Sequence, residues 1–211
     1  MSLTLPDVIQ RNDLAAFVER ALRLDDAAVI RLRQRADGLI AAWASTGLDV
    51  LAVRVVAGRL SRADLSCGAD ALARGLRSAD DSGHIDPGYP MDSAWRGALP
   101  PDTGFTHVDD VPAAVLTELA GRAAGLAKEH SSAHGPPASL LDQDVLQVSS
   151  GDTAVGVPMR CVFALTAMGF VPESPGAEEI VRVRLSPTWL RVDARYGSVY
   201  RRRGDPALVL R

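Results

Sequence analysis

One Asp- and Gly-rich stretch of this sequence contains side chains that could hold a metal ion. Asp81, His84 and Asp86, with Asp80 beside them, supply carboxylate oxygens and one imidazole close together in the chain. These are donor types that hold divalent cations. The same residue types are also common in solvated turns. The stretch therefore predicts either a metal site formed by Asp81, His84 and Asp86 or an ordinary loop.

Two further histidine patterns invite a chemical interpretation. His107 precedes Asp109 and Asp110, so a carboxylate could hold its ring as a general base, although aspartates there also suit the start of a helix. His130 and His134 have the i,i+4 spacing of zinc ligands on one helix face. The Gly-Pro-Pro that follows His134 ends any helix there, which favours a polar helix end instead.

Cys67 and Cys161 are the two cysteines of the chain. Cys161 lies in the first predicted turn of an apolar helix beside Arg160, where a cation could lower its pKa and make it a nucleophile. The apolar residues around it favour a buried structural thiol. The wide separation of the two cysteines indicates reduced thiols and therefore a cytoplasmic protein.

No motif in the sequence names a reaction. A Gly-x-Ser-x-Gly elbow, a Gly-x-x-x-x-Gly-Lys phosphate loop, a Gly-x-Gly-x-x-Gly fingerprint and a Cys-x-x-Cys pair are all missing. An active site can still be assembled from distant residues. The sequence leans against an enzyme, and we expect no cofactor.

Arginine supplies the strongest functional signal. Between Ile180 and Arg211 there are eight arginines against two aspartates, a balance of +6, whereas residues 79–130 carry nine acids against three bases, a balance of -6. An arginine face of this kind predicts a site for nucleic acid or another anion, or a row of solvated and internally paired charges. A second row occurs near the N-terminus. The predicted anion-binding residues are Arg182, Arg184, Arg191, Arg201, Arg202, Arg203, Arg31, Arg33, Arg35 and Arg54.

The composition is that of a folded, soluble protein. The 211 residues are 47% apolar and carry a net charge of -3, which excludes the class of disordered chains. No apolar stretch approaches the ~20 residues of a membrane helix, and the first residues lack the pattern of a signal peptide. We therefore expect no membrane association.

Periodicity predicts an α+β fold of two small lobes, each made of antiparallel strands packed with helices. The first lobe, residues 1–78, comprises a helix capped by Asp13, a three-stranded meander around Asp37-Gly38, and a helix beginning at Ser61 or Ser66. Residues 79–110 form a Gly/Pro/Asp-rich connector. No internal repeat is convincing.

The second lobe, residues 111–211, combines a helix, a short hairpin, an apolar helix from Met159 to Met168, and arginine-rich strands, with a further strand near 207–210. This order loosely resembles a winged-helix lobe, in which the last hairpin lies along phosphates.

Four short segments carry a likeness to known proteins: Trp95 to Pro101, Met168-Gly169-Phe170, Trp189-Leu190-Arg191 and Tyr196 to Tyr200. On these segments the chain resembles conserved hypothetical proteins of actinobacteria. That group has no assigned activity, so the resemblance implies a bacterial cytoplasmic setting and transfers no catalytic residues.

The leading hypothesis is thus a non-catalytic binding or interaction protein of this uncharacterised type, which binds a protein partner, itself or a small anion. One alternative is a nucleic-acid-binding protein that uses the arginine-rich C-terminal lobe. The other is an enzyme whose active site lies near the acidic, histidine-containing connector.

Overall fold

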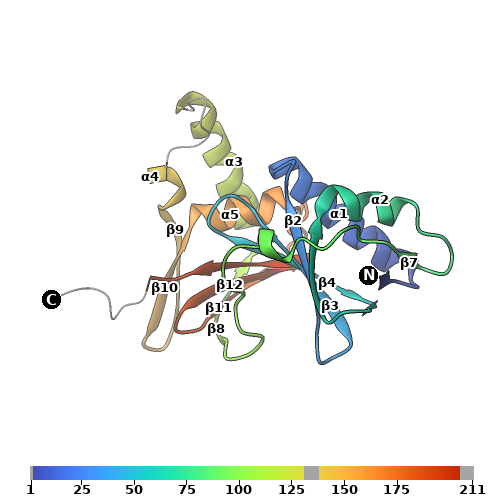
Figure 1. The fold of residues 1–211 in the computed structure, drawn as a ribbon. Coiled ribbons are helices and arrows are strands. Elements are labelled where there is room, and N and C mark those ends of the chain that lie inside the picture. Colours follow the sequence, from blue (N-terminus) through green and yellow to red (C-terminus); the bar gives the residue numbers. More distant parts are fainter. Residues whose placement is uncertain (1, 131–137, 205–211) are drawn as a thin grey trace. The chain divides into compact units, whose positions relative to one another are not determined.

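The computed structural model of the chain describes residues 2–130 and 138–204, which fold into two compact units (Figure 1). Unit 1 comprises Met1–Gly47 and Leu51–Leu99, and unit 2 comprises Leu48–Val50 and Pro100–Arg211. The predicted α+β class with two lobes is confirmed. The stretch predicted as a connector divides at Leu99, so part of it belongs to each unit. The predicted strand at 207–210 lies outside the described residues.

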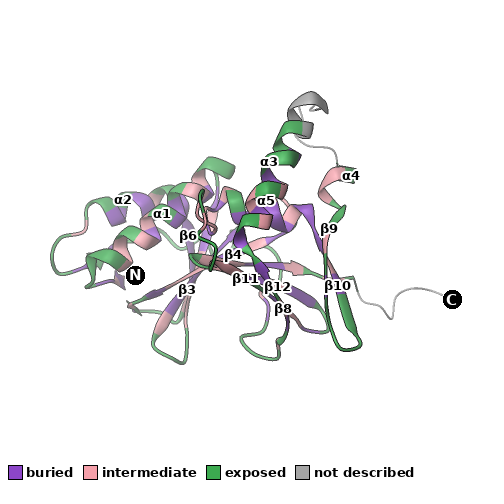
Figure 2. Cartoon of the chain, turned by 180° about the vertical axis from the view of Figure 1, so that it is seen from behind, coloured by how far each residue is buried: buried purple, intermediate pink, exposed green. Residues whose placement is uncertain are grey.

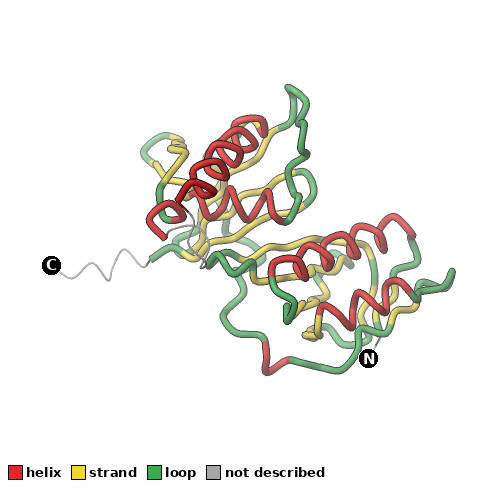
Figure 3. Tube along the Cα trace, turned by 90° about the horizontal axis from the view of Figure 1, so that it is seen from above, coloured by secondary structure: helices red, strands yellow, loops and turns green. Residues whose placement is uncertain are grey.

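Unit 1 is built on an antiparallel sheet with the strand order β6-β2-β3-β4, and α1 and α2 lie side by side on one face of it (Figure 3). A second sheet has the order β5-β1-β7. The elements are β1 (Leu3–Thr4), α1 (Val8–Leu24), β2 (Val29–Gln34), β3 (Leu39–Ser45), β4 (Leu51–Ala57), β5 (Arg59–Leu60), β6 (Asp64–Gly68), α2 (Ala69–Arg77), β7 (His84–Ile85) and the 3-10 helix η1 (Asp92–Ala94).

The predicted meander of unit 1 is confirmed by β2, β3 and β4. Ile30 and Leu32 point toward the helices and are fully buried, which is the period-two pattern of a half-covered strand. The turn between β2 and β3 uses Gly38 at φ +81°, a left-handed conformation that favours glycine.

Two predicted helix starts in unit 1 are wrong. The first helix begins at Val8, because Asp7 caps it by accepting a hydrogen bond from the Ile9 N–H at 2.7 Å. Asp13 lies inside this helix. The second helix begins at Ala69, because Leu65 and the residues around it extend as β6 along β2, where Leu65 to Gly68 are all buried. The apolar spacing that suggested one helix thus belongs to a strand followed by a helix.

Unit 2 is built on an antiparallel sheet with the strand order β13-β12-β11-β8, with α3 and α5 packed against each other on one face (Figure 3). A separate hairpin pairs β9 with β10. The elements are β8 (Thr106–Pro112), α3 (Ala113–His130), α4 (Ala138–Leu141), β9 (Asp144–Ser150), β10 (Thr153–Pro158), α5 (Met159–Ala167), β11 (Ile180–Leu185), β12 (Trp189–Ala194) and β13 (Gly197–Arg202).

Asp110 does not cap the third helix as predicted. It lies in β8, where it pairs with Arg182 of β11, and the strand continues to Pro112 before α3 begins. The loose likeness to a winged helix is not confirmed. The apolar helix of this lobe, α5, buries Met159, Cys161, Val162, Ala164 and Leu165. Helix α5 therefore packs in the core of unit 2.

Each core lies between the helices and the sheet of its own unit, as the buried inner faces in Figure 2 show. In the described part of the chain, no helix is both long enough and apolar enough to cross a membrane.

Candidate functional site

Aspartates neutralise most of the predicted arginine face of unit 2. Arg184 and Arg191 lie on neighbouring strands and share the carboxylate of Asp193, at 3.0 and 2.6 Å. Arg182 lies 3.7 Å from Asp110 on the edge strand β8. These ion pairs correspond to the internally paired arginine row that the sequence left open. They reduce the charge that this face offers to a phosphate.

The remaining predicted arginines of unit 2 do not join this row. Arg201 lies 3.6 Å from the carboxylate of Asp142, on the helix side of the sheet. Arg191, which belongs to the paired row, also stacks over the rings of Phe105 and Tyr200, with its guanidinium carbon 5.7 and 5.4 Å from their centroids. Arg202 and Arg203 form no ion pair within the described residues.

The arginine row of unit 1 is also paired. Arg31 binds Asp64 through two hydrogen bonds of 2.9 and 2.8 Å, and the Asp64 carboxylate raises the pKa of Arg31. Arg33 lies 3.7 Å from the same carboxylate. Arg35 pairs with Asp37 at 2.8 Å in the β2–β3 turn.

Arg54 lies on the opposite face of the same sheet, where it pairs with Asp13 of α1. The structure therefore does not bring Arg54 together with Arg31, Arg33 and Arg35.

The predicted metal ligands do not converge. The described part of the chain contains no group of three or more His, Cys, Asp or Glu side chains that could hold a metal ion. The carboxylate of Asp80 instead accepts hydrogen bonds from the N–H and hydroxyl of Ser82, which hold its pKa below the ordinary value. That of Asp86 accepts one from the Gly88 N–H at 2.9 Å. These bonds order the loop internally.

His107 does contact a carboxylate, as its position before two aspartates suggested. Its Nε2 lies 2.9 Å from Asp110 Oδ1, and both side chains are well exposed. His134 and the side chain of His130 lie outside the described residues.

Both cysteines are fully buried free thiols, which confirms their structural interpretation. Burial raises the pKa of Cys67 and of Cys161 to about 12, against an ordinary 9.0. Arg160 and Arg201 lower the pKa of Cys161 by too little to offset its desolvation. Neither thiol is a nucleophile at neutral pH.

The arginines without a carboxylate partner identify a surface that the sequence analysis missed. Eight arginines within the described residues form no ion pair. Half of them belong to the helices of unit 1: Arg11, Arg20 and Arg23 of α1 and Arg77 of α2. Arg11 bonds only a backbone carbonyl, that of Asp80. Sequence alone pointed to the C-terminal arginines because it counts charges without showing which carboxylate faces which guanidinium.

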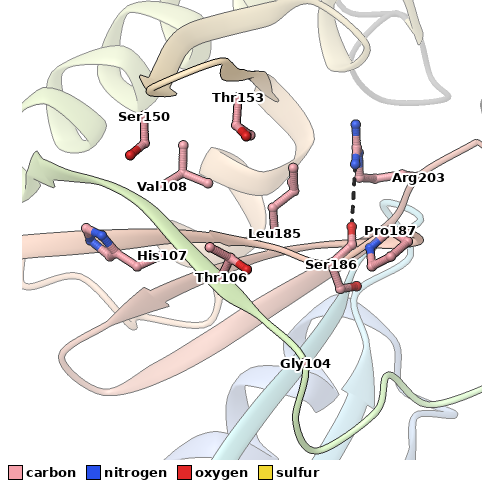
Figure 4. A pocket seen from close by; sticks show the side chains of 10 residues that line it. All are labelled: Gly104, Thr106, His107, Val108, Ser150, Thr153, Leu185, Ser186, Pro187 and Arg203. Atoms are coloured by element: carbon pink, nitrogen blue, oxygen red, sulfur yellow. Dashed lines mark hydrogen bonds between the residues drawn. The ribbon is translucent and has the colours of Figure 1, made fainter.

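Each unit also contains a pocket with both apolar and polar residues in its lining. The pocket of unit 1 has a volume of about 600 Å³ and lies beside the β2–β3 turn, with Arg35 and Arg59 in its lining. The pocket of unit 2 has a volume of about 290 Å³ and lies beside the β11–β12 turn, with His107 and Arg203 in its lining. Figure 4 shows Ser150 and Thr153 of the β9–β10 hairpin on one side of this second pocket.

Comparison with protein families assigns each unit separately. The family model described as domain of unknown function DUF8185 matches residues 100–206, just over half of the chain. The chain belongs to the DUF8185 family. A second model, domain of unknown function DUF8010, matches residues 1–97. The DUF8185 segment thus begins where unit 2 resumes, at Pro100. No curated protein matches the chain.

Comparison with solved structures places this DUF8185 protein in the fold of bacterial sliding clamps. A DNA polymerase sliding clamp from Caulobacter crescentus has a TM-score of 0.57 and 13% identity, covering 100% of this chain and 69% of its own. The beta subunit from the DNA polymerase of Streptococcus pyogenes has a TM-score of 0.59 and 11% identity, with 100% and 68% coverage. A sliding clamp from Bartonella birtlesii bound to griselimycin has a TM-score of 0.59 and 15% identity, with 96% and 64% coverage.

The chain spans about two thirds of the length of these clamps, and the low identities support the fold alone. The likeness nevertheless contradicts the leading hypothesis from the sequence, a non-catalytic interaction protein of an uncharacterised type. The solved structures that share this fold are described as sliding clamps or beta subunits of DNA polymerases.

Proposed function

We propose that this protein binds DNA as a clamp-like accessory protein and associates with a protein partner that acts on DNA. The observation that carries the proposal is the clamp fold, which extends over 96–100% of the chain in the matches to the Caulobacter, Streptococcus and Bartonella structures. A cytoplasmic location and the predicted actinobacterial origin are part of the same proposal.

The DNA-facing surface that we propose is the helix layer of unit 1. Its helices α1 and α2 carry five arginines against Asp13, Glu19 and Asp70. Asp13 is already occupied by Arg54 of the sheet, and Asp70 by Arg74 at 2.9 Å. Arg20, Arg23 and Arg77 therefore remain free to approach phosphates, and their long side chains suit that contact.

The helix layer of unit 2 offers less positive charge. Arg122 of α3 pairs with Glu118 one turn earlier, and Arg160 of α5 is mostly buried and pairs with Asp142. Unit 1 is therefore the better candidate for the electrostatic part of DNA binding.

The test is a titration of fluorescently labelled duplex DNA with the full chain at several salt concentrations. We expect binding at low salt that weakens as salt increases, because each neutralised phosphate releases a counterion. In the triple variant Arg20→Ala, Arg23→Ala, Arg77→Ala, the slope of log K against log salt should fall by about one unit per lost phosphate contact.

The matched control is Arg74→Ala, which removes an arginine of the same helix that is already paired with Asp70. It should leave the salt slope close to that of the wild type. The variant Arg182→Ala, Arg184→Ala tests the C-terminal face that the sequence suggested. Absence of binding at low salt would rule out the proposal, and a larger loss in the C-terminal variant than in the triple variant would move the surface to unit 2.

A further inference from the structure

The two pockets occupy equivalent positions in the two units. Each lies where the first turn of a three-stranded meander meets the residues that directly follow its third strand. In unit 1 these are the β2–β3 turn and Gly58-Arg59 after β4. In unit 2 they are the β11–β12 turn and Arg203 after β13. One arginine just past the last strand thus lines each pocket.

Similar hydrogen bonds hold the pocket region together in both units; we call this region, the first turn of the meander and the residues after its third strand, the corner. The N–H of Arg35 donates to the Leu39 carbonyl at 2.8 Å, and that of Ser186 donates to the Trp189 carbonyl at 2.9 Å. In both turns the residue after the first strand thus donates to the first residue of the next strand, although the turn of unit 1 is one residue longer. In unit 2 the N–H of Arg203 then donates to the Thr188 carbonyl at 2.8 Å. The arginine that follows β13 is held at the turn by the backbone.

In unit 1 the side chain of Gln34 makes the corresponding link. Its amide nitrogen donates to the carbonyls of Leu39 and Gly58, at 3.1 and 3.3 Å, and its oxygen accepts from the Leu60 N–H at 2.9 Å. Gly58 is required here, because a Cβ at this position would lie 2.3 Å from Leu5 Cδ2 and 2.8 Å from the Thr4 carbonyl oxygen. The backbone of Arg59 is also held in place, because Arg59 pairs with Thr4 of β1, while its side chain is exposed.

The charges around both pockets favour an anion. Neither lining contains a carboxylate. Asp37 pairs with Arg35, and Asp110 contacts His107, so the second basic group of each pocket is partly neutralised. Arg59 and Arg203 form no ion pair in the part of the chain that the structure describes. The guanidinium of Arg203 donates only to the Ser186 carbonyl, at a long 3.4 Å, as drawn in Figure 4.

Hydroxyl groups complete the donor set in unit 2. Thr106, Ser150 and Thr153 line the pocket together with the apolar side chains of Val108 and Leu185 (Figure 4). An arginine with several hydroxyl donors suits a phosphate group, and the apolar part suits the body of a small organic molecule. A volume of about 290 Å³ lies near the lower end for small-molecule sites, so the part of the ligand inside this pocket is no larger than a mononucleotide.

We propose that these corners are two equivalent sites, one per unit, for a small ligand that carries a phosphate group, with Arg59 and Arg203 as the anion-binding side chains. The proposal is independent of DNA binding by the helix layer, because it uses different arginines. The phosphate could belong to a free metabolite or to the 5′ end of a nucleic acid.

The experiment is an NMR titration of the 15N-labelled full chain with inorganic phosphate, at ionic strength held constant with chloride. We expect two sets of shifted amides, one in the β2–β3 turn and at Gly58 to Leu60, the other at Ser186 to Trp189 and around Arg203. The variant Arg59→Gln should weaken the first site about tenfold or more and leave the second unchanged, and Arg203→Gln should do the reverse.

The matched control is Arg202→Gln, which removes an exposed arginine next to Arg203 that does not line the pocket. It should leave both sites intact. Phosphate shifts no larger than those with chloride, or equal shifts in the wild type and both arginine variants, would overturn the proposal. Thymidine monophosphate and a 5′-phosphorylated oligonucleotide distinguish the two sources: competition by only one of them assigns the ligand, and competition by neither counts against the sites.

Discussion

Unit 1 and unit 2 repeat one architecture in a different chain order. In unit 1 a helix and a meander, α1-β2-β3-β4, precede the edge strand and second helix, β6-α2. In unit 2 the edge strand and helix, β8-α3, come first, and α5-β11-β12-β13 follow. The junctions agree closely: Ala69 N–H donates to the Ala28 carbonyl at 2.9 Å, and Ala113 N–H to the Glu179 carbonyl at 2.8 Å.

The same sequence pattern begins both meanders. Ile30-Arg31-Leu32-Arg33 in β2 corresponds to Val181-Arg182-Val183-Arg184 in β11, with the apolar residues inside and the arginines outside. The partners differ. A single half-buried aspartate on the edge strand, Asp64, pairs with both arginines of unit 1, whereas unit 2 uses Asp110 on its edge strand and Asp193 inside the meander. The two units therefore share the alternation of apolar residues and arginines, but they differ in which aspartates pair with those arginines.

The largest expected change in stability tests whether the buried faces of the two meanders contribute equivalently to the cores of their units. Leu32→Ala should cost about 2–5 kcal/mol of stability, and Val183→Ala about 1–3 kcal/mol, because both side chains are almost fully buried and the valine is smaller. Denaturant unfolding of each variant measures the two values. A loss below ~1 kcal/mol at Leu32 would show that the two positions are not equivalent.

The two cysteines provide a control that separates the units. Cys67 lies in the core of unit 1 and Cys161 in that of unit 2, and both are fully buried with a raised pKa. Labelling by a thiol reagent at pH 8 therefore requires local opening. We expect Leu32→Ala to accelerate labelling of Cys67 more than that of Cys161, and Val183→Ala to do the opposite. Equal acceleration at both thiols would mean that the units unfold together.

An intermediate effect tests the difference between the outer faces. Asp193 is 15% exposed and contacts Arg184, Arg191 and Ser198, so Asp193→Asn should cost about 1–3 kcal/mol. Asp64 is 41% exposed, so Asp64→Asn should cost less than about 1 kcal/mol. The midpoints of thermal unfolding compare the two variants, and the comparison fails if Asp64→Asn is the more damaging.

The smallest effect is expected at the helix surfaces. Arg74→Ala and Arg122→Ala each remove an exposed i,i+4 pair, with Asp70 and Glu118 respectively. Each should change stability by at most about 0.5 kcal/mol. Thermal unfolding checks this directly. A larger loss in either variant would indicate a contact of that arginine beyond its own helix.

Most regular elements could be predicted from the sequence, and the errors have one cause. Leu65 fits the apolar spacing of a helix and the alternation of a strand, and only its pairing beside β2 makes it β6. Asp110 resembles a helix cap, but β11 extends β8 past it to Pro112. The internal repeat was missed because its two copies share only a few residues and occur in a different order. In each case the deciding partner is distant in the chain.

The sequence by itself determined the α+β class, the meander of unit 1, the arginine-rich strands of unit 2, the apolar helix α5 and the burial of the two thiols, because local periodicity and composition carry that information. The tertiary structure decided which arginines are neutralised, since pairs such as Arg31 with Asp64 and Arg54 with Asp13 join residues far apart in the chain. It also moved the candidate DNA surface from the C-terminal arginines to α1 and α2. The arginines can be counted in the sequence, but whether a guanidinium group is available to a ligand depends on which carboxylates the fold places beside it.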